Sequence, residues 1–482
     1  MSRPLASSHP ALALALLAGL AACTVGPSFR RPNPPAPPSY LAPGEPGADP
    51  ASAAFAQRIE RGGTVPVRWW STFQSPALDE LVREAVAHNP TLAAARASLE
   101  EAEELVRAQA GARYPQVTLN GGAGRQQYGK EFLGSFFALP AFSYTSVGAS
   151  VSYNLDYLGG VARSIEERQA VAQYERSEAD AAYLALTGSV VNQALTIAAA
   201  RAQIEAVSEL LGEDRDNLRL VRTAFQNGSV SSVDVLTAQT QLATDETLLP
   251  PLRQQLDVAR HALAVLIGRA PGDWMPPDFE LGALKLPQRL PVSLPSQLAH
   301  RRPDILAAEA QLHAATAAVG IATANLYPQI TLTATGGFQS IAGDELFSTT
   351  NTAWTLISGF TAPVFDDGRL RAERRAALDE LKASAARYQL VVLESFDEVA
   401  NLLDALNHDA ELLAAQSNAL VAAESNVTLA RESYSAGNTG VLQVLDAQRQ
   451  RVNAQLGLLR AEAQRYIDTA QLYLALGGGG PG

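Results

Sequence analysis

The sequence predicts a mostly helical protein with a smaller β part, and three observations lead to this fold class. Several phrases of the sequence occur twice, about 210 residues apart. Four stretches of about ten or more residues alternate apolar and polar side chains, as strands with one wet face do. The run from Gly160 to Phe225 contains no proline and only two internal glycines, which is typical of a very long helix. Together these features predict a duplicated unit of strands and long helices.

The clearest repeated phrase is Tyr-Pro-Gln followed by a strand-like run, which begins at Tyr114 and again at Tyr327. Further phrases match on both sides of it: Pro90–Ala95 with Pro303–Ala308, Phe225–Gly228 with Tyr434–Gly437, and Val235–Gln239 with Val444–Gln448. A spacing of this size is far too long for a solenoid repeat. The sequence therefore indicates one large unit that is duplicated, each copy reading helix, strand, strand, long helix, tip and long helix.

Composition excludes several classes of function. The 482 residues carry a net charge of −12, which argues against nucleic acid as a partner. The single cysteine excludes an intramolecular disulfide. The sequence contains no Gly-x-Ser-x-Gly, no His-Glu-x-x-His and no phosphate-binding glycine-rich loop, and its histidines lack the spacing of metal ligands. We therefore expect no enzymatic activity, no metal and no cofactor other than a covalent lipid.

Residues 1–22 have the features of a bacterial lipoprotein signal peptide. Arg3 precedes an apolar run from Ala11 to Leu20 that is too short to span a bilayer as a mature helix. The run closes on Leu-Ala-Ala-Cys, and its Cys23 is the only cysteine of the chain. We expect Cys23 to be lipidated and to anchor the protein in the outer-membrane lipid. The alternative is an ordinary signal peptide with a cysteine at that place by chance.

The rest of the chain divides at changes in composition. Residues 23–74 are rich in Pro, Ala and Gly and are expected to form a lipid-anchored tether without a core of its own. The aromatic stretch Trp69–Phe73 is expected to dock on the main body. The remaining boundaries are a first repeat at 75–270, a proline-rich linker at 271–300, a second repeat at 301–476 and a glycine-rich disordered tail at 477–482.

The four alternating stretches are expected to be strands at about 114–126, 142–157, 327–339 and 351–365. Each has one apolar and one polar face, and many end in aromatic residues, as in transmembrane β-barrels. A soluble antiparallel sheet with one wet side gives the same alternation; the lipoprotein signal and the aromatic ends favour the membrane. Four strands cannot close a barrel, because about eight are needed and open edges in lipid leave backbone groups unpaired. We therefore expect several chains to pool their strands.

The long helices carry apolar residues seven apart, which predicts that they pack side by side. The seams are Ile204, Leu211, Leu218 and Phe225 in the first repeat, and Leu445, Val452, Leu459, Tyr466 and Tyr473 in the second. Leu456, Ala463 and Ala470 form a second seam beside the last one, which suits a ring of helices; a bundle with a filled centre remains the alternative. The helices turn at tips near 228 and 438, and Pro250-Pro251 must restart or kink the returning helix of the first repeat.

Three phrases of the sequence resemble one protein family, and the resemblance extends over essentially the whole mature chain. They are Cys23–Pro32, Trp69–Phe73, and Leu294–Ser296 together with Arg301–Ile305. They are similar to the lipoprotein branch of the TolC-like outer-membrane efflux proteins. The resemblance implies a homotrimer in the outer membrane of a Gram-negative bacterium, with a twelve-stranded barrel and a helical tunnel across the periplasm. It also implies two partners, a periplasmic adaptor and an inner-membrane pump of the resistance-nodulation-division class.

The resemblance also implies functional residues at the tips. Acidic side chains just after the turn form the periplasmic gate of the family, and the matching positions here are Asp446 first, Asp234 second, and Gln443, which departs from the two-acid pattern. An Asp favoured by the helix dipole is the alternative for Asp446. The small turn residues are expected to contact the adaptor: Gly228, Ser229, Gly437, Asn438 and Thr439.

The expected function is a passive exit duct for small toxic compounds across the periplasm and the outer membrane. One alternative is a duct of the same fold that serves type I protein secretion. Another is a non-conducting, lipid-anchored coiled-coil scaffold, which explains the lipid signal and the seams but not four alternating strands. A periplasmic lipoprotein enzyme would need motifs that the sequence lacks.

Overall fold

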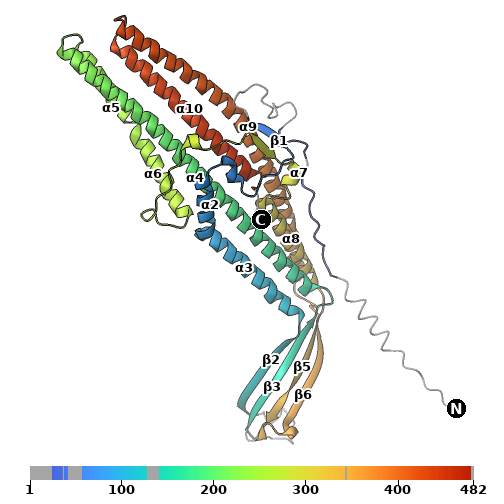
Figure 1. Cartoon of the computed structure of the whole chain (residues 1–482). Helices are drawn as coiled ribbons and strands as arrows, with labels where there is room; N and C mark the ends of the chain where they lie inside the picture. The colour runs from blue at the N-terminus through green and yellow to red at the C-terminus, as the bar shows by residue number, and fades with distance from the viewer. Residues whose placement is uncertain (1–23, 36, 42–56, 128–139, 342–344, 479–482) are drawn as a thin grey trace, which may run out of the picture. The chain divides into compact units, whose positions relative to one another are not determined.

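The computed structural model describes residues 24–35, 37–41, 57–127, 140–341 and 345–478 (Figure 1). Cys23, the signal peptide and the last four residues lie outside the described residues. The chain separates into two compact units, one comprising Met1–Pro32, Ser98–Glu175 and Ala308–Tyr388, and the other the remainder. Several helices contribute residues to both units, and each unit is described by itself.

The first unit contains a four-stranded antiparallel sheet in the order β2-β3-β5-β6. The strands are β2 (Gln116–Gln126), β3 (Phe142–Leu155), β5 (Gln329–Ser340) and β6 (Thr352–Thr361). Tyr157 and Val364, which the alternation placed in strands, lie just beyond the ends of β3 and β6. The aromatic and apolar alternation therefore continues past the last ladder hydrogen bonds.

The register of the sheet sorts its side chains into rows. Thr118 pairs with Ser150, Ser150 with Thr335, and Thr335 with Thr355, so one polar row crosses all four strands. The next row is apolar and contains Val117, Val151, Ala334 and Leu356. Because successive side chains of a strand point to opposite faces, these rows lie on opposite sides of the sheet. The alternation read from the sequence thus holds across the sheet.

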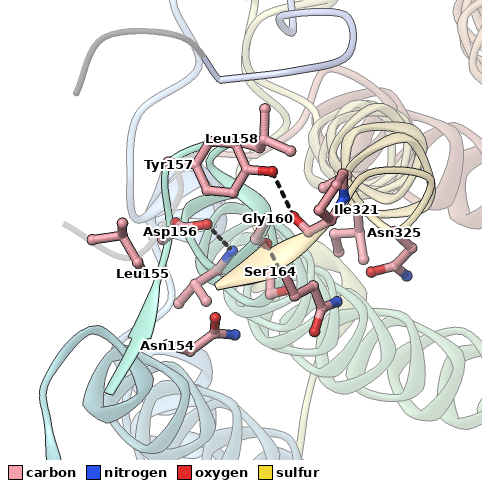
Figure 2. A pocket seen from close by; sticks show the side chains of 13 residues that line it. Asn154, Leu155, Asp156, Tyr157, Leu158, Gly160, Ser164, Ile321 and Asn325 are labelled. Atoms are coloured by element: carbon pink, nitrogen blue, oxygen red, sulfur yellow. Dashed lines mark hydrogen bonds between the residues drawn. The ribbon is translucent and has the colours of Figure 1, made fainter. Parts of the chain in front are cut away.

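In each repeat, an aspartate between the second strand and the long helix caps the start of that helix. Asp156 accepts hydrogen bonds from the N–H groups of Val161 (2.9 Å) and Ala162 (2.8 Å) at the start of α4 (Gly160–Gln226) (Figure 2). Asp366 accepts them from Gly368 (3.0 Å) and Leu370 (2.9 Å) at the start of α9 (Arg369–Ser435). These carboxylates satisfy donors that a helix end leaves unpaired. Two helices of 67 residues each therefore begin with a fixed orientation to the strand before them.

The residues that follow Cys23 are held on the first unit. The N–H of Val25 donates to the Leu158 carbonyl (3.0 Å), and the Arg163 guanidinium donates to the Val25 carbonyl (3.2 Å). The Phe29 ring stacks on His313 with centroids 4.2 Å apart. This part of the predicted tether is therefore held by contacts with the strand–helix junction.

The second unit contains most of the helical residues. Its helices, some shared with the first unit, include α2 (Pro76–His88), α3 (Pro90–Ala110), α5 (Ser232–Glu246), α6 (Leu249–Leu266), α8 (Pro303–Ala324) and α10 (Val441–Ala475). Ser75 caps α2, as the sequence predicts, by accepting from the Leu78 N–H. Pro250 and Pro251 fall in the first turn of α6, where a missing N–H costs nothing. The proline pair therefore restarts a helix.

The predicted seams are buried or partly buried, with one exception. Leu210 and Leu211 of α4 pack with Leu252 of α6 and Val452 and Leu456 of α10. Nearer the tips, Leu218 and Val221 pack with Ala238, Val441 and Leu445. Phe225 was expected to continue the first seam, but its side chain is 46% exposed. The seam ends before this position because the helix itself ends one residue later, at Gln226.

Two segments far apart in sequence pair with each other in the second unit. β1 (Arg58–Arg61) pairs in parallel with β4 (Arg289–Val292), so the end of the N-terminal segment joins the linker between the repeats. The Gln57 side chain, which is buried, donates to the Pro287 carbonyl (2.8 Å) and to Thr469 Oγ1 (3.2 Å). The linker also contains two short helices, η3 (Leu281–Ala283) and α7 (Pro295–Leu298).

An aromatic cluster forms where Trp69–Phe73 meets α10. Trp69 has no exposed surface, and its ring lies 5.8 Å from Tyr473 and 6.0 Å from Trp70. Phe73 is equally buried and lies 6.0 Å from Tyr466. The docking predicted for this aromatic stretch is confirmed, and its partners are the last two tyrosines of the predicted seam.

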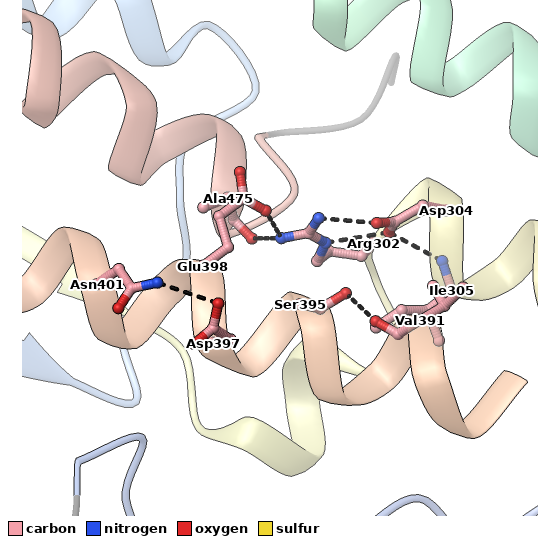
Figure 3. Close-up of polar contacts among 9 residues, drawn as sticks. All are labelled: Arg302, Asp304, Ile305, Val391, Ser395, Asp397, Glu398, Asn401 and Ala475. Atoms are coloured by element: carbon pink, nitrogen blue, oxygen red, sulfur yellow. Dashed lines mark hydrogen bonds and ion pairs between the residues drawn. The ribbon is translucent and has the colours of Figure 1, made fainter. Parts of the chain in front are cut away.

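Arg302 explains the Arg-Pro-Asp phrase of the sequence (Figure 3). Its guanidinium donates to both carboxylate oxygens of Asp304 (3.0 and 2.7 Å), to Glu398 of α9 (2.7 Å) and to the Ala475 carbonyl of α10 (2.8 Å). Only 13% of the arginine side chain is exposed. One planar cation thus joins the start of α8, the middle of α9 and the C-terminal end of α10.

Candidate functional site at the helical tips

Both long helices end in the same glycine turn. The Gly228 N–H donates to the Phe225 carbonyl (2.9 Å) and the Ser229 N–H to the Ala224 carbonyl (2.8 Å). The Gly437 and Asn438 N–H groups make the equivalent bonds to Tyr434 and Ser433, both at 2.9 Å. With φ of 71° and 74°, both glycines adopt the left-handed conformation that ends a helix in this motif. The turn itself therefore requires glycine, while the space around each Cβ position is open.

In the first repeat, Asp234 has a structural role. It occupies the third position of α5 and forms a capping box with Ser231. Its carboxylate accepts from the Ser231 hydroxyl (2.7 Å) and from the Ser231 N–H (2.8 Å). These hydrogen bonds, the hydroxyl first, hold the pKa of Asp234 below its usual value. A carboxylate engaged in this way fixes the direction in which the chain leaves the tip.

In the second repeat, Asp446 is bound less tightly. It lies in the second turn of α10, whose first turn carries no acidic residue, so the helix-dipole explanation for Asp446 is wrong. Its carboxylate accepts from Arg449 (2.9 Å) and from the Gln450 amide (2.7 Å), and half of its side chain, 51%, is exposed. An exposed pair of this kind is weak. The Asp446 carboxylate therefore stays accessible to solvent and ions.

An open groove lies between the two tips. Its lining includes predicted residues from both repeats, namely Gly228, Ser229, Asp234, Thr439 and Gln443. Gly437, Asn438 and Asp446 do not line it. The structure thus brings the equivalent positions Asp234 and Gln443 to one groove and leaves Asp446 outside it.

Comparison with known proteins decides the identity of this architecture. A family model described as "Outer membrane efflux protein" matches residues 81–269 and 294–478. The chain belongs to the outer membrane efflux protein family. The two matched ranges correspond to the two repeats, and the gap between them falls in the linker.

Relatives and solved structures agree with this family. The chain is 32% identical to the pyoverdine export outer membrane protein OpmQ of Pseudomonas aeruginosa over 86% of this chain and 87% of that protein. It is 30% identical to the toluene efflux pump outer membrane protein TtgC of Pseudomonas putida, over 95% and 93%. The outer-membrane channel OprN superposes with a TM-score of 0.86 at 27% identity, over 95% of this chain and 99% of that one. This efflux protein is therefore an outer-membrane channel component.

Several contacts near the tips were not found from the sequence. Glu213 of α4 accepts from Arg431 of α9 (3.3 Å) and from Arg451 of α10 (3.2 Å). Asn217 of α4 donates to Gln448 of α10 (2.7 Å). These polar contacts join the two repeats of the efflux protein within one chain. Their partners are more than 200 residues apart, and no local pattern indicates such pairs.

Two pairs of buried aspartates were also missed. Asp214 of α4 faces Asp245 of α5, and Asp409 of α9 faces Asp468 of α10, with at most 8% of any of the four residues exposed. Burial first, and then the hydrogen bond to the partner and its charge, raise the pKa of Asp214 and of Asp409 to about 7. Glu213 adds negative charge beside the first pair, and Arg465 adds positive charge beside the second. Each pair therefore retains a proton at neutral pH.

The buried pairs predict that thermal stability falls with rising pH. Their folded-state pKa of about 7 lies above the ordinary 3.8, so the folded protein binds more protons than the unfolded chain between these values. Stability from this source is complete below about pH 4 and is lost as the pH rises through 7. The Asp214→Asn/Asp409→Asn variant should melt about 1 °C higher than wild type for each kcal/mol of stability gained at pH 8. Calorimetric scans from pH 5 to 8 measure this difference.

Asp216→Asn is the matched control, because Asp216 lies on the same helix with 64% of its side chain exposed. It should keep the pH dependence of wild type. If the melting temperatures of wild type and the Asp214/Asp409 variant change with pH in parallel, the aspartate pairs do not bind the extra protons.

Among the residues that the structure describes, no three His, Cys, Asp or Glu side chains gather as metal ligands.

Proposed function

We propose that this efflux protein is the passive exit duct of a tripartite pump, through which small toxic organic compounds leave the cell. The observation that carries the proposal is the sheet, which has a polar row on one face, an apolar row on the other, and two open edges. Its named relatives export pyoverdine or toluene, which supports small organic molecules as the cargo. The duct performs no covalent step, and the pump supplies the energy.

The open edges of the sheet support a homotrimer. β2 and β6 each pair on one side only among the described strands. Unpaired backbone groups in lipid cost several kcal/mol each, so the edges must be covered by other strands. Joining β6 of one copy to β2 of the next in three copies closes a twelve-stranded barrel without a free edge. The long helices α4 and α9 of the three copies would then lie side by side and form the periplasmic tunnel.

The two faces of the sheet support a water-filled bore. The exposed apolar face includes Trp354 (78%) and Phe360 (77%), as a lipid-contacting surface requires. The opposite face presents hydroxyl groups, and Thr118 and Ser150 hydrogen-bond to one another at 2.6 Å across two strands. A wall of hydroxyls keeps water next to a polar solute.

The tips support docking of a periplasmic adaptor, which in turn contacts the inner-membrane pump. The lining of the groove between the tips includes the small residues Gly228, Ser229 and Gly440, and glycine allows close approach of a partner backbone. The lipid on Cys23 would supply the membrane anchor and is the only covalent group we propose. A duct for type I protein secretion remains the second candidate, because the same tube would serve it.

Asp446 is proposed as the periplasmic constriction. Asp446→Ala should raise the single-channel conductance in planar bilayers, because it removes the side chains that narrow the axis. It should also shift ion selectivity toward anions, because Arg449 loses its partner. Asp446→Asn keeps the size of the side chain and should change selectivity without the full rise in conductance. Unchanged conductance in Asp446→Ala would exclude this constriction.

The function itself is tested with a deletion strain challenged with antibiotics, dyes, solvents and metal ions. Sensitivity to organic compounds that the wild-type gene restores would support the efflux duct. Loss of a secreted protein without drug sensitivity would favour type I secretion. Purified protein without any conductance would show a scaffold and would contradict both ducts.

A further inference from the structure

The segment after β6 exposes two apolar residues and, after Asp366, Asp367 and Gly368, four arginines. Val364 and Phe365 are 95% and 89% exposed. Arg369, Arg371, Arg374 and Arg375 follow in the first two turns of α9, and all four are exposed. We call Val364–Arg375 the junction patch. The chain as a whole carries a net charge of −12, so this density of arginines is not the general character of its surface.

The arginines of the junction patch lie where a helix disfavours them. The N-terminal end of a helix carries partial positive charge, and cations there are unfavourable. The first turn of α9 contains no acidic residue. Arg371, Arg374 and Arg375 are spaced i, i+3 and i+4, so they share one helix face and repel one another. An arrangement with this cost suggests an anion that is supplied from outside the chain.

Internal partners satisfy only part of this charge. Arg369 pairs with Glu373 (2.6 Å), and Arg374 donates to Thr323 Oγ1 (3.3 Å). Asp366 lies nearby and compensates part of the charge: its oxygens accept from the N–H groups of Leu370 and Gly368, and these hydrogen bonds together with the charges of Arg369 and Arg371 lower its pKa. Arg371 and Arg375 make no hydrogen bond or ion pair with any residue that the structure describes. Two guanidinium groups therefore remain available.

The junction patch continues the lipid-contacting face of the barrel. Trp354, Leu356 and Phe360 lie on one face of β6, and Val364 has the same alternation parity. Apolar residues thus continue past the last strand residue, Thr361, and the arginines follow from Arg369 onward. In an outer-membrane channel, this point is the surface of the periplasmic leaflet. Aromatic residues followed by cations are the side chains that membrane interfaces favour.

The first repeat does not build the same patch. After β3, Arg163 is 4% exposed and pairs with Glu166 at 2.6 Å. The difference between the repeats shows that the strand–helix turn does not by itself require exposed arginines.

We propose that the junction patch binds the phosphate headgroups of anionic phospholipids in the periplasmic leaflet. Phe365 and Val364 would enter the acyl boundary, and Arg371 and Arg375 would reach the phosphates. The proposal rests on the outer-membrane location of the family and not on the exported compound. It would fix the height of the barrel in the bilayer independently of the lipid proposed at Cys23.

The test is native mass spectrometry of the full-length protein in detergent, titrated with dioleoylphosphatidylglycerol, dioleoylphosphatidylcholine or inorganic phosphate. Wild type should bind phosphatidylglycerol in preference to phosphatidylcholine. Arg371→Gln/Arg375→Gln should bind phosphatidylglycerol about 30-fold more weakly, since each basic residue near an anionic lipid surface contributes about a factor of five. Arg222→Gln/Arg253→Gln removes two exposed arginines elsewhere and should bind like wild type.

Three results would overturn the proposal. Equal binding of phosphatidylglycerol by wild type and the Arg371/Arg375 variant would exclude the patch. Displacement of the lipid by millimolar inorganic phosphate would show a free phosphate site. Loss of oligomers by this variant in lipid-free detergent would show that the arginines contact a second copy of the chain.

Discussion

Replacing Gly437 with phenylalanine should reduce the drug resistance that this efflux protein confers to the level of a deletion strain, while assembly in the outer membrane is unaffected. Gly437 is exposed at the tip of the second repeat, and a Cβ there meets nothing within 4 Å. A bulky side chain therefore projects outward, to where the proposed adaptor must approach. The measurement is the minimum inhibitory concentration of exported drugs, with the assembled protein quantified in membranes.

Two variants separate adaptor docking from backbone strain. With φ of 74°, any side chain at Gly437 costs about 1–2 kcal/mol. Gly437→Ala has the same strain without the bulk and should retain resistance. Gly62→Phe places phenylalanine at another glycine with φ of 79° and open space, far from the tip in sequence, and should also retain it. Full resistance in Gly437→Phe would exclude docking at this tip.

Trp69→Ala should destabilise the folded chain by about 3–5 kcal/mol, because a large buried aromatic side chain leaves a cavity. Trp69 has no exposed surface and lies between Trp70, Phe73 and Tyr473. Without the Trp69 ring, the N-terminal segment loses its contact with Tyr473 near the end of α10. Denaturant unfolding followed by tryptophan fluorescence and circular dichroism measures the change.

Trp69→Phe retains most of the ring volume and should lose less than half as much stability. Met275→Ala is a surface control, since Met275 is 73% exposed, and should be nearly neutral. A Trp69→Ala variant that unfolds at the wild-type denaturant concentration would mean that this aromatic cluster does not hold the segment.

The sequence predicts features that arise from local physical rules. Alternation in the strands, the proline restart of α6 and the Ser75 cap each depend on a few neighbouring residues. The same holds for both glycine tips, because a helix end with positive φ selects glycine. The four strands, the long helices and the duplication were therefore predictable from periodicity and repetition.

The features that the sequence did not predict depend on distant partners. In the sequence, Arg302 is one basic residue of a family phrase. Its contacts with Glu398 of α9 and with the Ala475 carbonyl of α10 form only in the folded chain. Nothing in the sequence around Asp409 indicates which helix will face it.

The candidate site shows the same limit at a single position. The resemblance assigns both Asp234 and Asp446 to the gate, although they occupy different positions of the repeated motif. The structure places Asp234 in a capping box with Ser231, which a Ser-x-x-Asp spacing at 231–234 already permits. The proposed constriction therefore depends on Asp446, and substitution of Asp234 should affect the tip's stability as well as any conductance.

The contacts of Gln57 set an order of events during biogenesis. Its partners Pro287 and Thr469 lie 230 and 412 residues further along the chain. Gln57 therefore lacks its Thr469 partner until almost all of the protein has been translocated. Such late closure leaves a long interval in which periplasmic chaperones can bind the nascent segment.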